Sequence, residues 1–294
     1  MKRKTKITII ILIVLGLLLS IIWNFFISYY FEVDRETIEP REEIKICNIE
    51  TQNYQNRKVF VVYPKDSKTE LTIFYFHGGA YMAEATENHW NFIQKLAIDT
   101  NSTIIMPDYP LAPKSNYIDV YNFVEPLYKE KVMNMDVNKL IVMGDSAGGG
   151  LALGLMEKMS VEGINMPNKI VLISPWLDVR LNNPYIAETQ KRDKQLNRDT
   201  LKLAGLAYSN VDDNYLINPI DGDLSKLKNI IVFTGKDDIL NPDVNVLKDK
   251  AKEQGNDIEI KEYDNAAHIW IIDKNSDEEI VKKGYEDLLE VIKK

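Results

Sequence analysis

The chain has very little cysteine: among its 294 residues, only Cys47 occurs. A single cysteine cannot form an intramolecular disulfide, and the spacing that structural zinc sites or haem attachment require is missing. Histidine is almost as scarce, with only His77, His89 and His268. These shortages exclude a disulfide-stabilised scaffold, and they leave few residues for any reaction that needs an imidazole.

The sequence also lacks internal repeats, low-complexity tracts and an excess of positive charge. It holds 36 basic and 44 acidic residues, and all but four of the basic ones lie after residue 31, where the net charge is −12. A body of this sign should avoid nucleic acid, because phosphate backbones attract cationic surfaces. Hydrophobic residues make up 45% of the chain. This share is typical of a globular protein with a substantial core.

One long apolar run is present, over residues 7–31, after a basic head that contains Lys2, Arg3, Lys4 and Lys6. A run of this length is sufficient to cross a bilayer as a helix. No small-residue cleavage site follows it, which favours an uncleaved anchor over a signal peptide. The basic head predicts a cytoplasmic N-terminus and an extracytoplasmic body. From the sequence we therefore expect a single-pass membrane protein, with residues 1–31 as head and anchor.

Strand-like and helix-like segments alternate through most of the remaining chain. Residues 32–57 are interpreted as a linker or partial cap, and residues 58–294 as one α/β domain. Strands are expected over residues 58–64, 71–76, 102–107, 139–143, 169–173, 229–234 and 257–263, and helices over residues 88–100, 117–130, 147–159, 244–254 and 276–293. This alternation predicts a mostly parallel sheet with helices on both faces. An insertion over about residues 179–222, with helices near 185–191 and 198–208, could form a cap over one end of the sheet. Ser276 and Glu279 are spaced as a capping box for the last helix.

The strongest local signal is the Gly-x-Ser-x-Gly motif at Gly144, Ser146 and Gly148. An apolar strand precedes it and a helix rich in small residues follows it. This strand–turn–helix context is the one that a nucleophile elbow requires, because the sharp turn exposes the serine hydroxyl at the end of the sheet. Ser146 is therefore the candidate nucleophile.

A serine hydroxyl needs a base, and the base needs an acid that orients it. In the order serine, acid, histidine, only His268 follows Ser146, and it lies in a loop after the last expected strand. The acid should follow the preceding strand, where Asp237, Asp238 and Asp243 are candidates. Spacing alone leaves these three open.

Attack on an ester carbonyl creates an oxyanion, which backbone N–H groups can stabilise. Ala147, directly after the candidate nucleophile, supplies one N–H group. The loop from His77 to Ala80 follows an early strand and could supply others, since its glycines allow the backbone to approach a substrate closely.

The motifs together resemble the hormone-sensitive-lipase-like family of α/β-hydrolases. The matching segments are residues 77–81, 108–113, 144–149, 174–178, 238–240 and His268. The resemblance implies carboxylic ester hydrolysis, with Ser146 as nucleophile, His268 as base and Asp238 as acid. It also implies an oxyanion hole built from Gly79, Ala80 and Ala147, with Gly78 shaping the turn. Ala80 departs from the family pattern, which has a third glycine there.

The sequence thus predicts a membrane-anchored serine esterase with an α/β-hydrolase fold, a small helical cap insertion and one preceding transmembrane helix. Its substrate would be a small-molecule, lipid or glycan ester with a short or medium acyl group. Tyr81, Trp176 and Trp270 are candidate pocket walls. No metal or organic cofactor is expected. Two alternatives remain at this stage: a serine peptidase or amidase on the same fold, and an inactive ligand-binding homologue.

Overall fold

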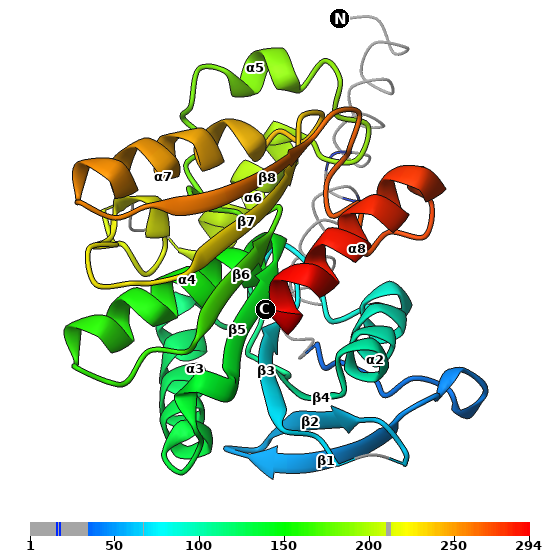
Figure 1. Ribbon diagram of the computed structural model, residues 1–294. Coiled ribbons are helices and arrows are strands. Elements are labelled where there is room, and N and C mark those ends of the chain that lie inside the picture. Colours follow the sequence, from blue (N-terminus) through cyan, green and yellow to red (C-terminus); the bar gives the residue numbers. More distant parts are fainter. Residues whose placement is uncertain (1–15, 17, 19–34, 67, 210–212) are drawn as a thin grey trace, which may run out of the picture. The chain divides into compact units, whose positions relative to one another are not determined.

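A computed structural model of the protein describes residues 16, 18, 35–66, 68–209 and 213–294 (Figure 1). The chain divides into two compact units, Met1–Arg35 and Glu36–Lys294. Very little of the first unit is described, so the fold and the site below are those of the second.

The prediction of an N-terminal transmembrane helix is wrong on this structure. Among the described residues, no helix combines the length and the apolar character that crossing a bilayer requires. Of the predicted span, residues 7–31, only Gly16 and Leu18 are described, and the rest lies outside the described residues. An apolar run meets the length criterion in sequence, but hydropathy alone does not determine that the run forms a continuous spanning helix. The membrane anchor is therefore not retained, nor is the expected placement of a cytoplasmic N-terminus and an extracytoplasmic body.

The second unit is built on an eight-stranded sheet with the order β1-β2-β4-β3-β5-β6-β7-β8. The first two pairings, β1 with β2 and β2 with β4, are antiparallel, and all the others are parallel. The strands are β1 (Asn48–Tyr54), β2 (Arg57–Tyr63), β3 (Leu71–Phe76), β4 (Ser102–Pro107), β5 (Leu140–Asp145), β6 (Lys169–Ile173), β7 (Ile230–Gly235) and β8 (Ile258–Tyr263). The expected mostly parallel α/β sheet is confirmed.

Helices cover both faces of this sheet (Figure 1). The α-helices are α2 (Glu87–Thr100), α3 (Tyr117–Val132), α4 (Ser146–Val161), α5 (Ile186–Thr189), α6 (Arg198–Tyr208), α7 (Asn241–Glu253) and α8 (Glu278–Lys293), and the short 3-10 helices are η1 (Glu42–Ile44), η2 (Val137–Lys139) and η3 (Pro219–Asp221). Helices α2 and α8 pack in one core cluster, and α3, α4 and α7 pack in the other. Alternate residues of β5 enter the two clusters, because successive side chains of a strand point to opposite faces.

The central strand β5 is buried along its whole length, as are nearly all residues of α4. A strand covered on both faces needs a continuous apolar run, and for this reason its sequence shows no alternation. Helix α8, by contrast, buries one stripe that includes Leu288 and Ile292. Its cap differs from the sequence prediction: Asp277, not Ser276, accepts the N–H groups of Glu279 and Ile280. A carboxylate one residue later performs the same capping function.

Strand β1 lies within the segment that the sequence analysis took as linker or partial cap. It pairs with β2 through a tight turn in which Gln55 and Asn56 have φ of 48° and 63°. Such positive φ values at both central positions suit a two-residue hairpin. The strand lies at the edge of the sheet and its central residues are exposed, so it carries no alternating apolar pattern by which the sequence could have revealed it.

The segment between β6 and β7 holds α5, α6 and η3, and it is the stretch that the sequence analysis interpreted as a cap insertion. Parallel strands β5 to β8 end at the same edge of the sheet, and the loops that follow them meet there. This edge positions the candidate site.

Candidate active site

Ser146 occupies a sharp turn between β5, which ends at Asp145, and α4, which begins at the serine itself. Its φ is 51°, a left-handed conformation that costs energy for a residue with a side chain. Space at the turn is limited: a Cβ on Gly144 would lie 2.3 Å from the Gly148 carbonyl oxygen, and a Cβ on Gly148 would lie 2.1 Å from that of Phe76. The two glycines of the motif are therefore steric requirements of the turn.

The structure brings Ser146, His268 and Asp238 together from three separate loops. The Oγ atom of Ser146 lies 2.9 Å from Nε2 of His268, and Nδ1 of His268 lies 2.8 Å from Oδ2 of Asp238. All three side chains are buried, with 6% of Ser146 and 5% of His268 exposed. A hydroxyl, an imidazole and a carboxylate in this order can pass a proton from the hydroxyl to the imidazole.

The pKa of His268 is raised above its usual 6.5. Burial by itself would lower this pKa, but the charge of Asp238 and the hydrogen bond to it favour the protonated imidazole more strongly. An imidazolium that forms during a reaction would therefore be stabilised in place.

The other two candidate acids are engaged elsewhere. Asp237 forms an ion pair with Arg192 of the cap insertion, with 3.0 Å between Oδ1 and Nε. Asp243 is buried and accepts a hydrogen bond of 2.9 Å from the amide of Asn183. Burial raises the pKa of Asp243 to about 7. Neither aspartate has a hydrogen bond to His268 among the contacts of the described residues.

The turn from Gly78 to Tyr81 lies beside Ser146. A Cβ on Gly78 would lie 2.9 Å from Cβ of the serine. The N–H of Gly78 donates to Asp145, whereas the internal hydrogen bonds of the turn run from Met82 and Ala83 to the Gly79 carbonyl. Gly79, Ala80 and Tyr81 have φ of 121°, 54° and 59°. Alanine thus adopts a left-handed conformation here, which is unusual for a residue with a Cβ atom.

Asp145 connects this turn to the elbow, a role that sequence reasoning missed. Its carboxylate accepts hydrogen bonds from the Tyr75 hydroxyl and from the N–H of Gly78, and it lies 3.3 Å from Nε2 of His89. The side chain is fully buried, which would raise its pKa, yet the charges of His89 and His77 and the hydrogen bonds from His89 and Tyr75 hold the pKa below its usual value. A buried carboxylate with several donors is a rigid connection between loops.

Two further residues form hydrogen bonds with the backbone next to Asp238 and His268. Asp193, from the cap insertion, accepts the N–H of Ile239 at 2.9 Å, next to Asp238. Ser174, which begins the loop after β6, accepts the N–H of Ile269 at 3.1 Å, next to His268. Asp193 is one of many polar residues in the cap, so no sequence signal distinguishes it.

Two of the three predicted pocket residues lie near each other. Tyr81 is stacked on Trp176, with ring centroids 5.8 Å apart, and on Tyr208 of α6, with centroids 3.7 Å apart. The backbone N–H of Trp176 donates to the Ser146 carbonyl at 2.8 Å. Trp270 does not join them: it packs against Tyr263 with 5.0 Å between ring centroids, in the core cluster that contains α2 and α8.

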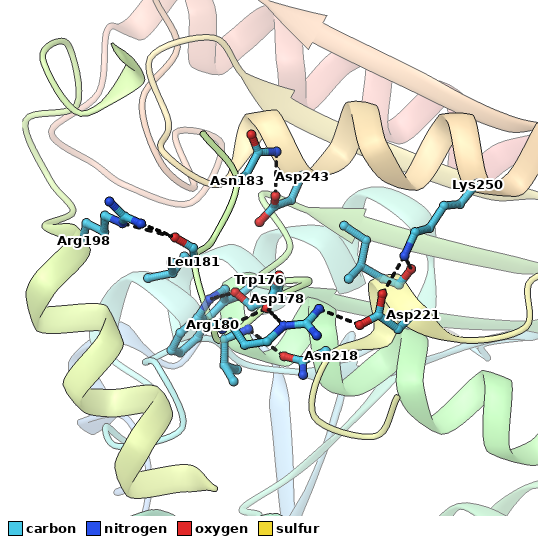
Figure 2. A network of polar contacts seen from close by, with 12 residues as sticks. Trp176, Asp178, Arg180, Leu181, Asn183, Arg198, Asn218, Asp221, Asp243 and Lys250 are labelled. Atoms are coloured by element: carbon cyan, nitrogen blue, oxygen red, sulfur yellow. Dashed lines mark hydrogen bonds and ion pairs between the residues drawn. The ribbon is translucent and has the colours of Figure 1, made fainter. Parts of the chain in front are cut away.

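Figure 2 shows how polar contacts hold the start of the cap insertion. Arg180 forms ion pairs with Asp178 at 2.7 Å and with Asp221 at 2.5 Å, and Lys250 of α7 also binds Asp221. In the view of Figure 2, the Asn183–Asp243 hydrogen bond is drawn above this network. Although several aspartates take part, the described part of the chain holds no group of three or more histidine, cysteine or acidic side chains arranged for a metal ion.

Comparison with known proteins adds to this geometry. The family model of the alpha/beta hydrolase fold matches residues 73–272. An esterase from Acinetobacter venetianus is 31% identical over 202 residues, which cover 67% of this chain and 66% of the relative. An acetyl-hydrolase from Streptomyces hygroscopicus is 24% identical over 204 residues, 68% of each protein. The matched region thus spans about two thirds of the length of these curated relatives.

A solved structure of a lipase is similar to this chain over a larger part of its length. A hormone-sensitive lipase from a metagenome library superposes with a TM-score of 0.79 and 25% identity, covering 86% of this chain and 85% of that one. The chain therefore belongs to the α/β-hydrolase fold family as a hormone-sensitive-lipase-like member, and it is a carboxylic ester hydrolase.

Proposed function

We propose that the protein hydrolyses small-molecule carboxylic esters with short or medium acyl groups through an acyl-enzyme on Ser146. His268 is the general base and acid, and Asp238 orients it. The observation that carries this proposal is the continuous pair of short contacts, 2.9 Å from Ser146 to His268 and 2.8 Å from His268 to Asp238. These distances are within the hydrogen-bond reach that proton transfer requires.

In the first half of the reaction, Oγ of Ser146 attacks the ester carbonyl carbon and its proton passes to Nε2 of His268. The carbonyl π electrons move to oxygen and form a tetrahedral oxyanion. When this intermediate collapses, the bond to the alcohol oxygen breaks and His268 returns its proton to the leaving alcohol. Asp238, which accepts Nδ1–H, keeps the imidazole in the tautomer whose Nε2 is free to accept a proton.

In the second half, water attacks the acyl-enzyme while His268 takes one of its protons. A second oxyanion forms and collapses, the bond from Oγ to the acyl carbon breaks, and His268 returns the proton to Oγ. The products are a carboxylic acid and the free serine. The raised pKa of His268 is consistent with this alternation, because the imidazolium must persist until the leaving oxygen takes its proton.

The oxyanion would be stabilised by the N–H groups of Gly79, Ala80 and Ala147. Ala147 lies in the first turn of α4, where N–H groups have no acceptor within the helix. The three left-handed residues from Gly79 to Tyr81 reverse the chain beside the serine. Gly78 is not a donor in this proposal, because its N–H is bound to Asp145.

The surroundings of the serine favour a small acyl group. Tyr81, the last residue of the turn from Gly78 to Tyr81 (the oxyanion turn), packs on Trp176 and Tyr208, and all three side chains are buried. Aromatic rings packed at this density leave little room for a long alkyl chain. The similarity to an acetyl-hydrolase is consistent with this preference.

Chromogenic esters test the proposal directly. The full chain is assayed with p-nitrophenyl esters from acetate to laurate, and with the p-nitroanilide of acetic acid as the amide counterpart. We expect turnover to be greatest with short acyl groups and weak with the anilide. Anilide hydrolysis as fast as acetate hydrolysis would favour an amidase instead.

A serine-directed fluorophosphonate locates the nucleophile. Ser146→Ala should lose labelling and reduce kcat by several orders of magnitude, since nucleophile removal in a serine protease costs about 10⁶-fold. Ser160→Ala, on the same helix α4, is the matched control and should keep both the labelling and the kcat of the wild type. Labelling that persists in Ser146→Ala would assign the nucleophile to another residue.

A further inference from the structure

The turn from Gly79 to Tyr81 is held in an uncommon conformation. All three residues have φ between 54° and 121°, and two of them carry a Cβ atom. Left-handed conformations of such residues are unfavourable, so they persist only where the surrounding structure determines them. The contacts that hold this turn therefore bear on catalysis, because its N–H groups would face the substrate.

Hydrogen bonds with a side chain at one end and with the backbone at the other hold the two ends of the turn. The Gly78 N–H donates to Asp145 at 3.0 Å, and the Tyr81 carbonyl accepts the N–H of Ala112 at 2.8 Å. These bonds attach the turn to the elbow and to the loop after β4. They do not act on the direction of the Tyr81 side chain.

Two aromatic rings determine where the Tyr81 side chain lies. Trp176 comes from the loop after β6, and Tyr208 is the last residue of cap helix α6. The Tyr81 and Tyr208 rings are nearly parallel, at an interplanar angle of 5° and a centroid distance of 3.7 Å. Both tyrosines are fully buried, with at most 1% of the side chain exposed. A ring packed this tightly cannot rotate without displacing its neighbour.

We propose that Tyr208 is a positioning residue for ester hydrolysis: through its stack on Tyr81, the cap holds the oxyanion turn in its reactive geometry. This inference rests on the proposed function, since it requires that the Ala80 N–H stabilises the oxyanion. It assigns to the cap a part in assembling the catalytic site. Movement of α6 away from the sheet would remove the ring that supports Tyr81 and let the turn relax.

The contact between Tyr208 and Tyr81 is made by the face of the Tyr208 ring, not by its hydroxyl group. Within the described residues, the buried hydroxyl of Tyr208 has no hydrogen-bond partner. Tyr208→Phe should therefore keep kcat. Tyr208→Leu removes the ring, and we expect kcat for p-nitrophenyl acetate to fall by about 10- to 10²-fold, the loss that a displacement of about 1 Å can cause. KM should stay within about threefold, because ground-state binding does not use the oxyanion contact.

Tyr128→Leu is the matched control. Tyr128 is also a buried tyrosine without a hydroxyl partner among the described residues, but it packs on Phe74, away from the turn. Tyr128→Leu should lower the melting temperature about as much as Tyr208→Leu does, while leaving kcat unchanged. If Tyr208→Leu does not fold, Tyr208→Met carries the same expectation, because its flexible, unbranched side chain adapts more easily to the space that the ring leaves.

A trifluoromethyl ketone supplies a readout that a merely structural role would not change. It adds reversibly to the serine and forms a tetrahedral oxyanion, so its affinity for Tyr208→Leu should weaken by about the same factor as kcat. Unchanged kcat in Tyr208→Leu, an equal loss in Tyr208→Phe, or an unchanged ketone affinity would overturn the inference. Failure of the proposed function is a different result, namely turnover that survives in Ser146→Ala.

Discussion

The N–H of Gly78 donates a hydrogen bond to Asp145, with 3.0 Å between the nitrogen and Oδ1. Through this bond the residue before Ser146 holds the start of the turn from Gly78 to Tyr81. Asp145 is itself fixed by burial and by the Tyr75 hydroxyl. One buried carboxylate therefore links the proposed nucleophile, Ser146, to the turn that carries the proposed oxyanion donors.

Asp145→Asn should reduce kcat by about 10-fold or more while the protein still folds. The amide is isosteric, but it replaces one acceptor oxygen with a donor that faces other donors, which weakens the network. Steady-state kinetics and a thermal melt measure the two effects. Tyr75→Phe removes one donor and leaves the Gly78 bond in place, so its kcat should fall less than that of Asp145→Asn. Full turnover in Asp145→Asn would refute the positioning role.

Asp238→Asn should reduce kcat strongly, by up to about 10⁴-fold, the loss known for the corresponding change in a serine protease. An asparagine would favour the tautomer of His268 that cannot accept the serine proton. Asp237→Asn is the neighbouring control: it breaks only the ion pair with Arg192, so kcat should change little. If instead Asp237→Asn were the inactive variant, the acid would be misassigned.

Activity should rise with pH through the pKa of His268. The base acts when neutral, and because Asp238 raises its pKa above 6.5, the rise in kcat/KM should be centred above pH 6.5. A pH profile with p-nitrophenyl acetate, corrected for spontaneous hydrolysis, measures this midpoint. Removing the charge in Asp238→Asn should move the midpoint of any residual activity to lower pH. A flat profile from pH 5 to pH 9 is incompatible with this base.

Glu157→Gln should stabilise the protein at neutral pH. Glu157 is buried in α4, has no hydrogen-bond partner among the described residues, and its pKa is raised well above 4.5 by burial and by the nearby charges of Asp223 and Asp221. Above about pH 4.5 the unfolded chain releases this proton while the folded chain retains it, so stability falls as pH rises until the folded pKa is passed.

Thermal melts over a pH series measure the effect of Glu157. The melting temperature of Glu157→Gln should exceed that of the wild type at pH 7, by about 2–4 °C for each kcal/mol gained in a domain of this size. The two curves should converge near pH 4. A difference that does not depend on pH would mean that the carboxyl charge is not responsible.

The sequence by itself determined the local parts of this protein. The apolar strand, the glycines and the helix around Ser146 are contiguous in the sequence. Because their steric demands act within a few residues, the elbow can be predicted from the sequence alone. The order serine, acid, histidine was predictable as well, because each candidate follows a strand and parallel strands end at one edge. The choice of Asp238 over Asp237 and Asp243 came from the family resemblance. Strand β1 could not be predicted from the sequence, since an exposed edge strand needs no apolar pattern.

Only the tertiary structure decided which distant residues meet. Asp145 and Gly78 are 67 positions apart, and the Tyr81–Tyr208 stack joins the oxyanion turn to the cap across an even longer separation. No local pattern encodes these pairs, because any buried tyrosine or aspartate has the same sequence signature until the chain packs around it. The same limit applied to the apolar run over residues 7–31: hydropathy measures what a segment can do in a bilayer, whereas the structure a segment adopts depends also on what surrounds it.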